Sequence, residues 1–282
     1  MPACVSCGRE IPPAPVGEVN ICPECRAAIL ARAPSQNPLP ARRRSVALEH
    51  MPVTAVFIGL NVLVFVLMTL SGVSFTTPQL HQLVKWGADW GPYTLTTQPW
   101  RILTSNYVHI GIIHIALNMW CLWNLGALAE RIFDRWTYVL TYTACGIGGS
   151  ILGVWWHPET VEAGASGAIF GIAGALIAAL YLGRLPVPPS ALKATLKSLL
   201  SFAGYNLFFG AVVPGISNAA HLGGLVTGLA LGAVLAPRLT APPDERNSWR
   251  RLIFIAAGVL LFALFYFVRR AVLHAALGSE GP

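Results

Sequence analysis

Two polar residues lie at the start of apolar segments and together could carry out nucleophilic chemistry. Ser166 opens the stretch Ser-Gly-Ala-Ile-Phe-Gly-Ile-Ala-Gly-Ala-Leu, and His221 begins a second apolar stretch later in the chain. A serine hydroxyl is a weak nucleophile until a base removes its proton, and a neutral imidazole can do this near pH 7. Because a histidine inside a membrane helix is costly, it indicates a function. The pair predicts hydrolytic chemistry.

Three further residues could support that chemistry. Hydrolysis builds negative charge on a carbonyl oxygen, and fixed hydrogen-bond donors must meet it. His114 and Asn118 are four residues apart, on one face of a predicted helix, and the N–H of Ser166 lies at a helix start. We predict that these donors form an oxyanion hole, although His114 and Asn118 could instead bond across helices. For His109 we expect a structural role, in which it holds the preceding loop in place, and not a catalytic one.

The elements that must position Ser166 and His221 are two glycine-rich helices. Gly224 and Gly228 form a GxxxG motif just after His221, and Gly167, Gly171 and Gly174 follow Ser166. Small residues on both helices allow close backbone contact. No acidic residue lies near His221 in the sequence, so we expect a Ser/His dyad and not a triad. Phe170, one turn after Ser166, is expected to stack on the imidazole.

The composition is that of a membrane protein. Of the 282 residues 55% are hydrophobic and 11% are charged, and the mean hydropathy is +0.60. Soluble proteins carry roughly 25% charged residues. Long apolar runs favour membrane-spanning helices over a β-barrel. Seven spans are predicted, at about residues 52–70, 110–128, 137–156, 166–182, 196–213, 217–235 and 252–268.

The basic residues predict the orientation of these spans. With the N-terminus in the cytoplasm, fifteen lysines and arginines lie on the inner side and four on the outer side. This is the positive-inside asymmetry, although the outer Arg269-Arg270 pair runs against it. It accounts for the net charge of +7, and we expect no nucleic-acid partner. Ser166, His221 and His114 then lie at comparable depth, a few residues below the outer surface.

Four cysteines near the N-terminus predict a separate metal-binding module. Cys4, Cys7, Cys22 and Cys25 form the pattern CxxC-x14-CxxC, which is the ligand spacing of a zinc ribbon. A redox-active dithiol pair is the alternative. Four cysteine ligands leave no open position, so we expect structural and not catalytic zinc in residues 1–33, followed by a linker at 34–50. Contact with a cytoplasmic partner and modulation of the membrane domain are both open as its role.

Taken together, these motifs resemble the rhomboid family of intramembrane serine proteases. The resemblance covers about residues 98–236. Its motifs are Trp100-Arg101, His109-x4-His114-x3-Asn118, Gly164-Ala-Ser166-Gly167 and Ser217-Asn-Ala-Ala-His221-Leu-Gly-Gly-x3-Gly228. Phe170 departs from the tyrosine that many relatives carry, but it keeps an aromatic ring.

The resemblance implies an all-α membrane fold. A rhomboid-like core of six transmembrane helices would occupy residues 51–236. A cytoplasmic loop, a seventh transmembrane helix and a short tail would follow at 237–282. The short, compact form with a cytoplasmic zinc ribbon is typical of prokaryotes, so we expect the protein in the plasma membrane of a bacterium.

The resemblance also implies an activity. Ser166 would be the nucleophile and His221 the base of a serine endopeptidase that needs no cofactor for catalysis. Its substrates would be transmembrane segments of membrane proteins, cut within the lipid bilayer near their outer ends. The alternative is a catalytically silent rhomboid-like protein that binds membrane clients. A transporter would need paired intramembrane charges or broken inverted repeats, and neither is clear in this sequence.

Overall fold

The computed structural model describes residues 1–13, 19–32, 51–213 and 215–278. The chain divides into two compact units, Met1–Ser45 and Val46–Pro282. The predicted linker at 34–50 lies outside the described residues. In the described residues the regular structure is helical, and strand pairing is limited to two isolated bridges, Ala3 with Glu10 and Asp89 with Glu162.

The first unit consists of a cysteine-bearing turn and one helix. α1 spans Pro23–Arg32 and carries Glu24 in its first turn, where a negative charge favours the helix dipole. The Arg9 guanidinium pairs with the Glu24 carboxylate at 2.6 Å, which joins the turn to the helix. Both side chains are exposed, so this pair adds little to stability.

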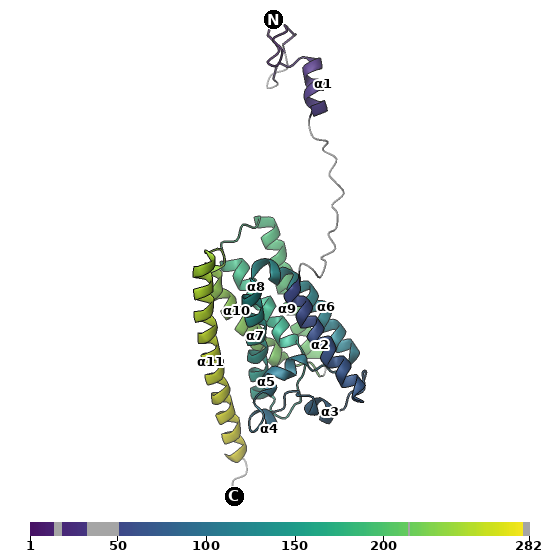
Figure 1. Cartoon of the computed structure of the whole chain (residues 1–282), viewed down its shortest axis with the longest axis vertical. Coiled ribbons are helices and arrows are strands. Elements are labelled where there is room, and N and C mark those ends of the chain that lie inside the picture. Colours follow the sequence, from purple (N-terminus) through teal and green to yellow (C-terminus); the bar gives the residue numbers. More distant parts are fainter. Residues whose placement is uncertain (14–18, 33–50, 214, 279–282) are drawn as a thin grey trace. The chain divides into compact units, whose positions relative to one another are not determined.

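The second unit is a bundle of long helices (Figure 1). Its long helices are α2 (Pro52–Leu70), α6 (Gly111–Ile132), α7 (Arg135–Trp156), α8 (Ser166–Leu182), α9 (Pro189–Val212), α10 (Asn218–Leu235) and α11 (Pro243–Gly278). The short elements are α3 (Leu80–Lys85), α4 (Gly91–Thr94), α5 (Arg101–Thr104), η2 (Ser105–Tyr107) and η3 (Ala236–Arg238). The predicted all-α membrane fold, with six core helices and one extra C-terminal helix, is confirmed.

Among the described residues, five helices are long and apolar enough to cross a membrane: α2, α6, α7, α10 and α11. α8 is apolar but has 17 residues. α9 is not among the five, and it begins at Pro189, ahead of the predicted 196, so that Lys193 and Lys197 lie in its first turns. α11 also begins earlier than predicted, at Pro243, because Asp244 and Glu245 suit the first turn of a helix.

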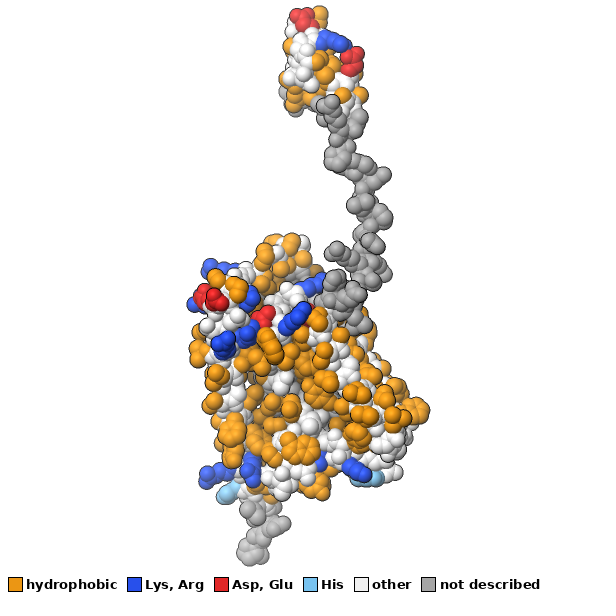
Figure 2. Space-filling view, in the orientation of Figure 1, with side chains coloured by type: hydrophobic (Ala, Val, Ile, Leu, Met, Phe, Trp, Pro, Cys, Tyr) orange, Lys and Arg blue, Asp and Glu red, His pale blue; other side chains and the backbone are white. Residues whose placement is uncertain are grey.

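The surface of the second unit matches a protein that spans a membrane. Figure 2 shows hydrophobic side chains along the sides of the bundle, while lysine and arginine gather near its two ends. Exposed apolar residues such as Val66, Phe208 and Phe262 belong to three different helices. Such an apolar belt would be costly in water and suits contact with lipid tails.

α8 forms the centre of the bundle. Nearly every residue from Gly167 to Leu180 is buried, and Ile172 and Leu176 lie in a core shared with α2, α6, α7 and α9. At 1.5 Å per residue, 17 residues span about 25 Å, which is less than the roughly 30 Å of a bilayer core. A helix enclosed by protein can be this short because other segments cover its ends.

The segment from Ser71 to Ile110 covers one end of the bundle and is ordered by a buried arginine. Arg101 donates from Nη1 to the carbonyls of Val84 (2.6 Å) and Ala88 (2.7 Å), and from Nε to Gln98 (2.8 Å). Its guanidinium therefore holds α3 and α5 together. Burial lowers the pKa of Arg101, but the group stays charged because an arginine pKa lies far above neutrality.

Candidate active site

The geometry of the site begins with the contact between α8 and α10. A Cβ built on Gly224 would lie 1.9 Å from the carbonyl oxygen of Gly167, and one built on Gly228 would lie 1.9 Å from that of Gly171. Real Cβ atoms do not approach this closely, so only glycine fits at these two positions of α10. The two backbones therefore touch at points about one helical turn apart, which brings the starts of both helices together.

An aromatic ring of α8 holds the imidazole of α10. The rings of Phe170 and His221 stack with their centroids 4.2 Å apart and their planes 11° from parallel. Ser166 lies one turn before Phe170 on the same helix face, and it is half-buried. His221 is 7% exposed, and among the described residues none bonds to its Nδ1. The ring plane is thus fixed by stacking and not by a carboxylate.

His114 presents one ring nitrogen to the loop before Ser166. The backbone N–H of Ile110 donates to His114 Nδ1 at 3.2 Å, so Nδ1 carries no proton and the neutral ring is protonated on Nε2. A Cβ on Gly164 would lie 2.8 Å from Nε2, and Gly164 has a φ of +131°, which favours glycine. Asn118 donates from Nδ2 to the carbonyl of His114 at 3.0 Å.

His109 connects the covering segment to the nucleophile loop. It is fully buried, and Ala165 N–H donates to its Nε2 at 3.5 Å. Its Nδ1–H points to the carbonyl of Tyr107 at 3.3 Å, which assigns the tautomer. Burial lowers the pKa of His109 to about 3, with a smaller contribution from His114. A neutral His109 therefore holds the residue just before Ser166.

Three polar residues to which the sequence analysis gave no role also lie around this site. The backbones of Asp89 and Glu162 pair in both directions, at 2.8 and 2.9 Å. The Glu162 carboxylate accepts a bond of 2.6 Å from Ser217, which caps α10. Buried acids are rare in a chain with 12 aspartates and glutamates in all, but no spacing rule connects these positions. Of the three, only Ser217 has a local signal for its role, because it lies directly before an apolar helix, where serine is a common N-cap.

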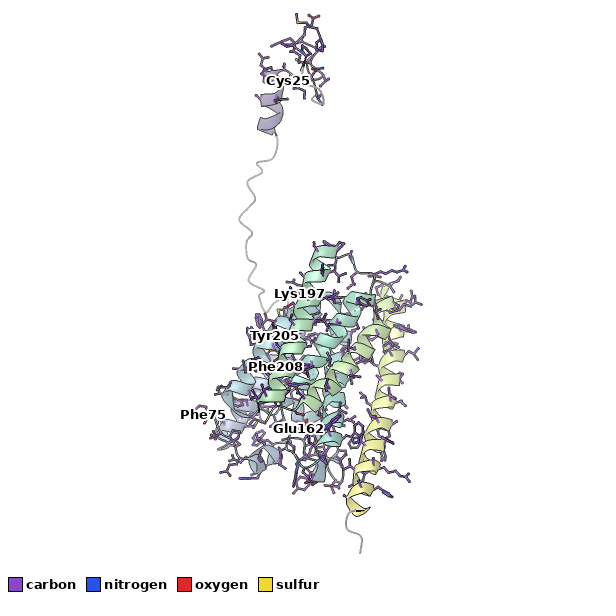
Figure 3. The ribbon with its side chains drawn as sticks, turned by 180° about the vertical axis from the view of Figure 1, so that it is seen from behind. Cys25, Phe75, Glu162, Lys197, Tyr205 and Phe208 are labelled. Atoms are coloured by element: carbon purple, nitrogen blue, oxygen red, sulfur yellow. The ribbon has the colours of Figure 1, made fainter. Side chains whose placement is uncertain are left out.

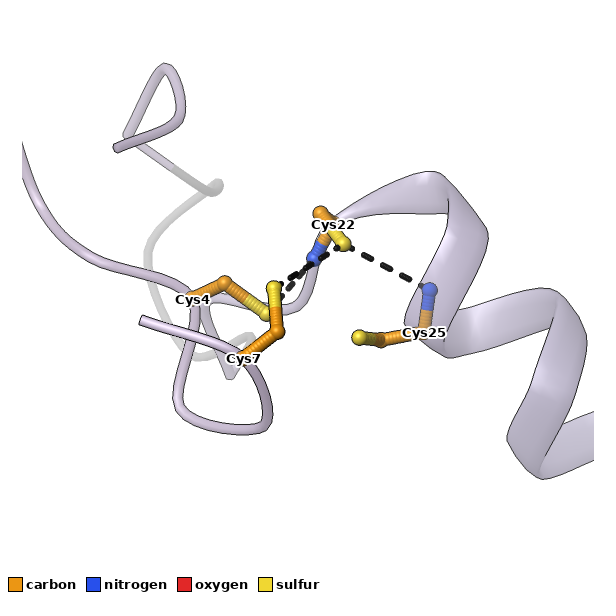
Figure 4. Close-up of side chains that lie close together, drawn as sticks. All are labelled: Cys4, Cys7, Cys22 and Cys25. Carbon is orange, nitrogen blue, oxygen red and sulfur yellow. Dashed lines mark hydrogen bonds between the residues drawn. The ribbon is translucent and has the colours of Figure 1, made fainter. Parts of the chain in front are cut away.

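The four N-terminal cysteines form a second site, in the first unit (Figure 4). Their sulfur atoms all lie within 4.8 Å of one another, and Cys7 Sγ is 3.7 Å from Cys22 Sγ. Zinc–sulfur bonds of about 2.3 Å in a tetrahedron place sulfur atoms about 3.8 Å apart, so this donor set fits zinc. The Cys22 N–H donates to Cys4 Sγ at 3.2 Å and helps to lower the pKa of that thiol to about 6.

Comparison with known proteins gives the family. Residues 96–238 match the Rhomboid domain, and this segment makes up half of the chain. The chain belongs to the rhomboid family. This rhomboid protein is therefore a multi-pass membrane protein of a family that includes intramembrane proteases.

Several curated proteins are similar to this rhomboid protein. Rhomboid protease GluP of Bacillus subtilis is 36% identical over 212 residues, which cover 75% of this chain and 40% of GluP. RHOMBOID-like protein 6, mitochondrial, of Arabidopsis thaliana is 37% identical over 62% of this chain and 56% of its own length. Rhomboid protease AarA of Providencia stuartii is 26% identical, over 83% of this chain and 89% of its own. The match to GluP and to the Arabidopsis protein thus spans only part of those relatives.

Proposed function

We propose that this protein is an intramembrane serine endopeptidase that uses Ser166 and His221 as a dyad. The observation that carries the proposal is the stacked pair of Phe170 and His221, held across a backbone contact between α8 and α10. Ser166 lies one helical turn from Phe170, so its hydroxyl and the imidazole share one side of that contact. The similarity to GluP and AarA, both named as proteases, supports the same activity.

The reaction follows from the roles of these groups. His221 takes the proton of Ser166 Oγ as the oxygen attacks the scissile carbonyl carbon. The negative charge that forms on the carbonyl oxygen is met by His114 Nε2–H, the Asn118 amide and the Ser166 N–H. His221 then gives its proton to the leaving amine, and the acyl chain remains on Ser166. Water, deprotonated by His221, attacks this ester; the bond to Ser166 Oγ breaks, His221 returns the proton to that oxygen, and the second product leaves as an acid.

A transmembrane segment must open before it can be cut, because helical peptide bonds are protected by hydrogen bonds and sterics. Helix-breaking residues in the substrate should therefore favour cleavage. Of the six core helices α9 has the fewest buried residues, only Leu199 and Ala203, so we expect it to yield to a substrate at lower cost than the other five. Figure 3 shows Lys197, Tyr205 and Phe208 along this helix.

Cleavage of a model single-span protein in liposomes tests the dyad. We expect cleavage by the wild type and none by Ser166→Ala or His221→Ala, with all three proteins equally folded. Binding of the substrate without cleavage by the wild type would contradict the proposal and support the client-binding alternative.

We also propose that Cys4, Cys7, Cys22 and Cys25 hold a structural zinc ion. A module this small has too little core to fold without a metal or a covalent link. The metal would order the turn and the start of α1. Elemental analysis should find about one zinc per chain, lost in Cys22→Ser but kept in Cys121→Ser, because Cys121 lies outside the cluster. Equal zinc in the wild type and Cys22→Ser would contradict this assignment.

The orientation proposed for the chain places the N-terminus in the cytoplasm of a bacterial cell, with the zinc module at 1–33 ahead of the protease core at 51–236. The unequal distribution of basic residues supports it. After a chelator has removed the zinc, a membrane-impermeant thiol reagent should label the N-terminal cysteines in inverted membrane vesicles but not in intact cells. Labelling in intact cells would contradict the orientation.

A further inference from the structure

Glu162 is a buried carboxylate in the loop between α7 and α8, four residues before Ser166. Glu162 is 9% exposed. The backbone of Glu162 pairs with that of Asp89, so the loop is joined to the segment that covers this end of the bundle. Figure 3 shows Glu162 near the end of the bundle opposite Lys197. The backbone bonds to Asp89 thus fix the position from which the Glu162 side chain extends.

The side chain of Glu162 reaches the start of the His221 helix. Ser217 Oγ donates to Glu162 Oε1 at 2.6 Å, and Ser217 Oγ itself accepts the N–H of Ala220 at 3.1 Å. The His221 N–H in turn donates to the carbonyl of Ser217 at 3.2 Å. Glu162 therefore bonds the residue that caps α10, one turn ahead of the imidazole.

The surroundings of this carboxylate are built for it. A Cβ on Gly153 would lie 2.0 Å from Glu162 Oε2, so in its present position the carboxylate packs directly against the glycine of α7. Oε2 has no partner among the described residues. Burial raises the pKa of Glu162, while the bond from Ser217 lowers it. A buried acid with only one bonded oxygen is costly.

We propose that Glu162 is a positioning residue that fixes the start of the His221 helix relative to the loop leading into Ser166. It touches neither substrate nor reacting atoms, and it acts through Ser217. The inference rests on the proposed Ser/His dyad. A displacement of about 1 Å between two reacting groups can cost 100-fold in rate. The hydrogen bond between Glu162 and Ser217, which we call the clamp, joins the loop before Ser166 to the start of α10 and should therefore have a large effect on the rate.

The test compares variants that break the clamp with one that keeps it. Ser217→Ala and Glu162→Leu should each lower kcat at least tenfold with KM within twofold of the wild type. The double variant should be no slower than either one, because both remove the same bond. Glu162→Gln, whose amide oxygen still accepts from Ser217, should retain at least half of the wild-type kcat. Tyr138→Phe removes a buried hydroxyl at the other end of α7 and is the matched control for stability.

Hydrogen exchange of residues 217–223 provides a readout that does not depend on activity. Exchange there should be faster in Ser217→Ala and Glu162→Leu, and unchanged in Glu162→Gln and Tyr138→Phe. Three results would overturn the inference. They are a wild-type exchange rate in Glu162→Leu, losses of kcat that multiply in the double variant, and a loss of kcat in Tyr138→Phe equal to that in Glu162→Leu. A wild type that does not cleave refutes the proposed function instead, and the exchange data then decide the positioning role alone.

Discussion

Adding one methyl group at Gly224 tests whether the contact between α8 and α10 positions the active site. The Cβ of Gly224→Ala would lie 1.9 Å from the Gly167 oxygen, 2.7 Å from its carbonyl carbon and 3.2 Å from its Cα. All three atoms belong to the backbone, so no side chain can rotate to make room. The two helices must therefore move apart.

The size of the movement follows from these distances. Ordinary contact begins at 3.4 Å, so the nearest pair must separate by 3.4 minus 1.9 Å, which is about 1.5 Å. A misplacement of about 1 Å between catalytic groups costs roughly 100-fold in rate. We therefore expect kcat to fall at least 100-fold, with a small effect on KM. Overpacking should also lower the free energy of unfolding by about 1–3 kcal/mol.

The assay is cleavage of the single-span substrate in liposomes. A thermal unfolding curve of each variant gives the fraction that is folded at the assay temperature. Gly258→Ala is the matched control, because a Cβ at this position of α11 meets nothing within 4 Å. It should leave kcat unchanged. A folded Gly224→Ala protein with kcat within twofold of the wild type would refute the claim that this contact sets the geometry of the dyad.

Three further predictions follow from the same structure. Phe170→Ala should lower kcat at least tenfold and Phe170→Tyr should not, because either aromatic ring can stack on the imidazole; equal rates for the alanine variant would exclude that role. His114→Ala should lower kcat by about 100- to 1,000-fold at constant KM if it serves the oxyanion, and a loss below tenfold would argue against this. Burial raises the pKa of Asp89 from 3.8 to about 7; the hydrogen bond from Thr94 and the charge of Arg101 lower the pKa, and repulsion from Glu162 raises it further. Because the folded state then holds the proton more tightly, up to about 4 kcal/mol of stability should be lost as pH rises from about 4 to 7. Asp89→Asn should weaken this decline in melting temperature, and an identical pH profile would contradict the assignment.

Much of the fold could be predicted because long apolar runs mark helices directly. The predicted span at 166–182 agrees with α8, whose start is marked by glycine and serine before a continuous apolar run. The helices α9 and α11 begin earlier than the spans predicted from about 196 and 252. Charged residues such as Lys193 and Arg250 suggest a loop, but a helix continues past the bilayer edge when its first turn begins with proline or acidic residues.

The candidate site was only partly accessible from the sequence. Ser166, His221, His114 and Asn118 follow from motifs with fixed helical spacing, and their catalytic roles stay predictions. The clamp at Glu162 could not be predicted, because it depends on the backbone pairing with Asp89 across 73 positions of the chain. Such a contact is decided by how loops pack after the helices have assembled. No local pattern of residue types records it.

The central claim is that His221 activates the hydroxyl of Ser166. A fluorophosphonate reagent reacts with an activated serine and leaves a stable adduct that mass spectrometry can assign to a peptide. We predict one adduct, on Ser166, in the wild-type protein, and loss of that adduct in His221→Ala at equal folded fraction. Equal labelling of Ser166 in the wild type and in His221→Ala, or no labelling of a wild type that cleaves its substrate, would contradict the account.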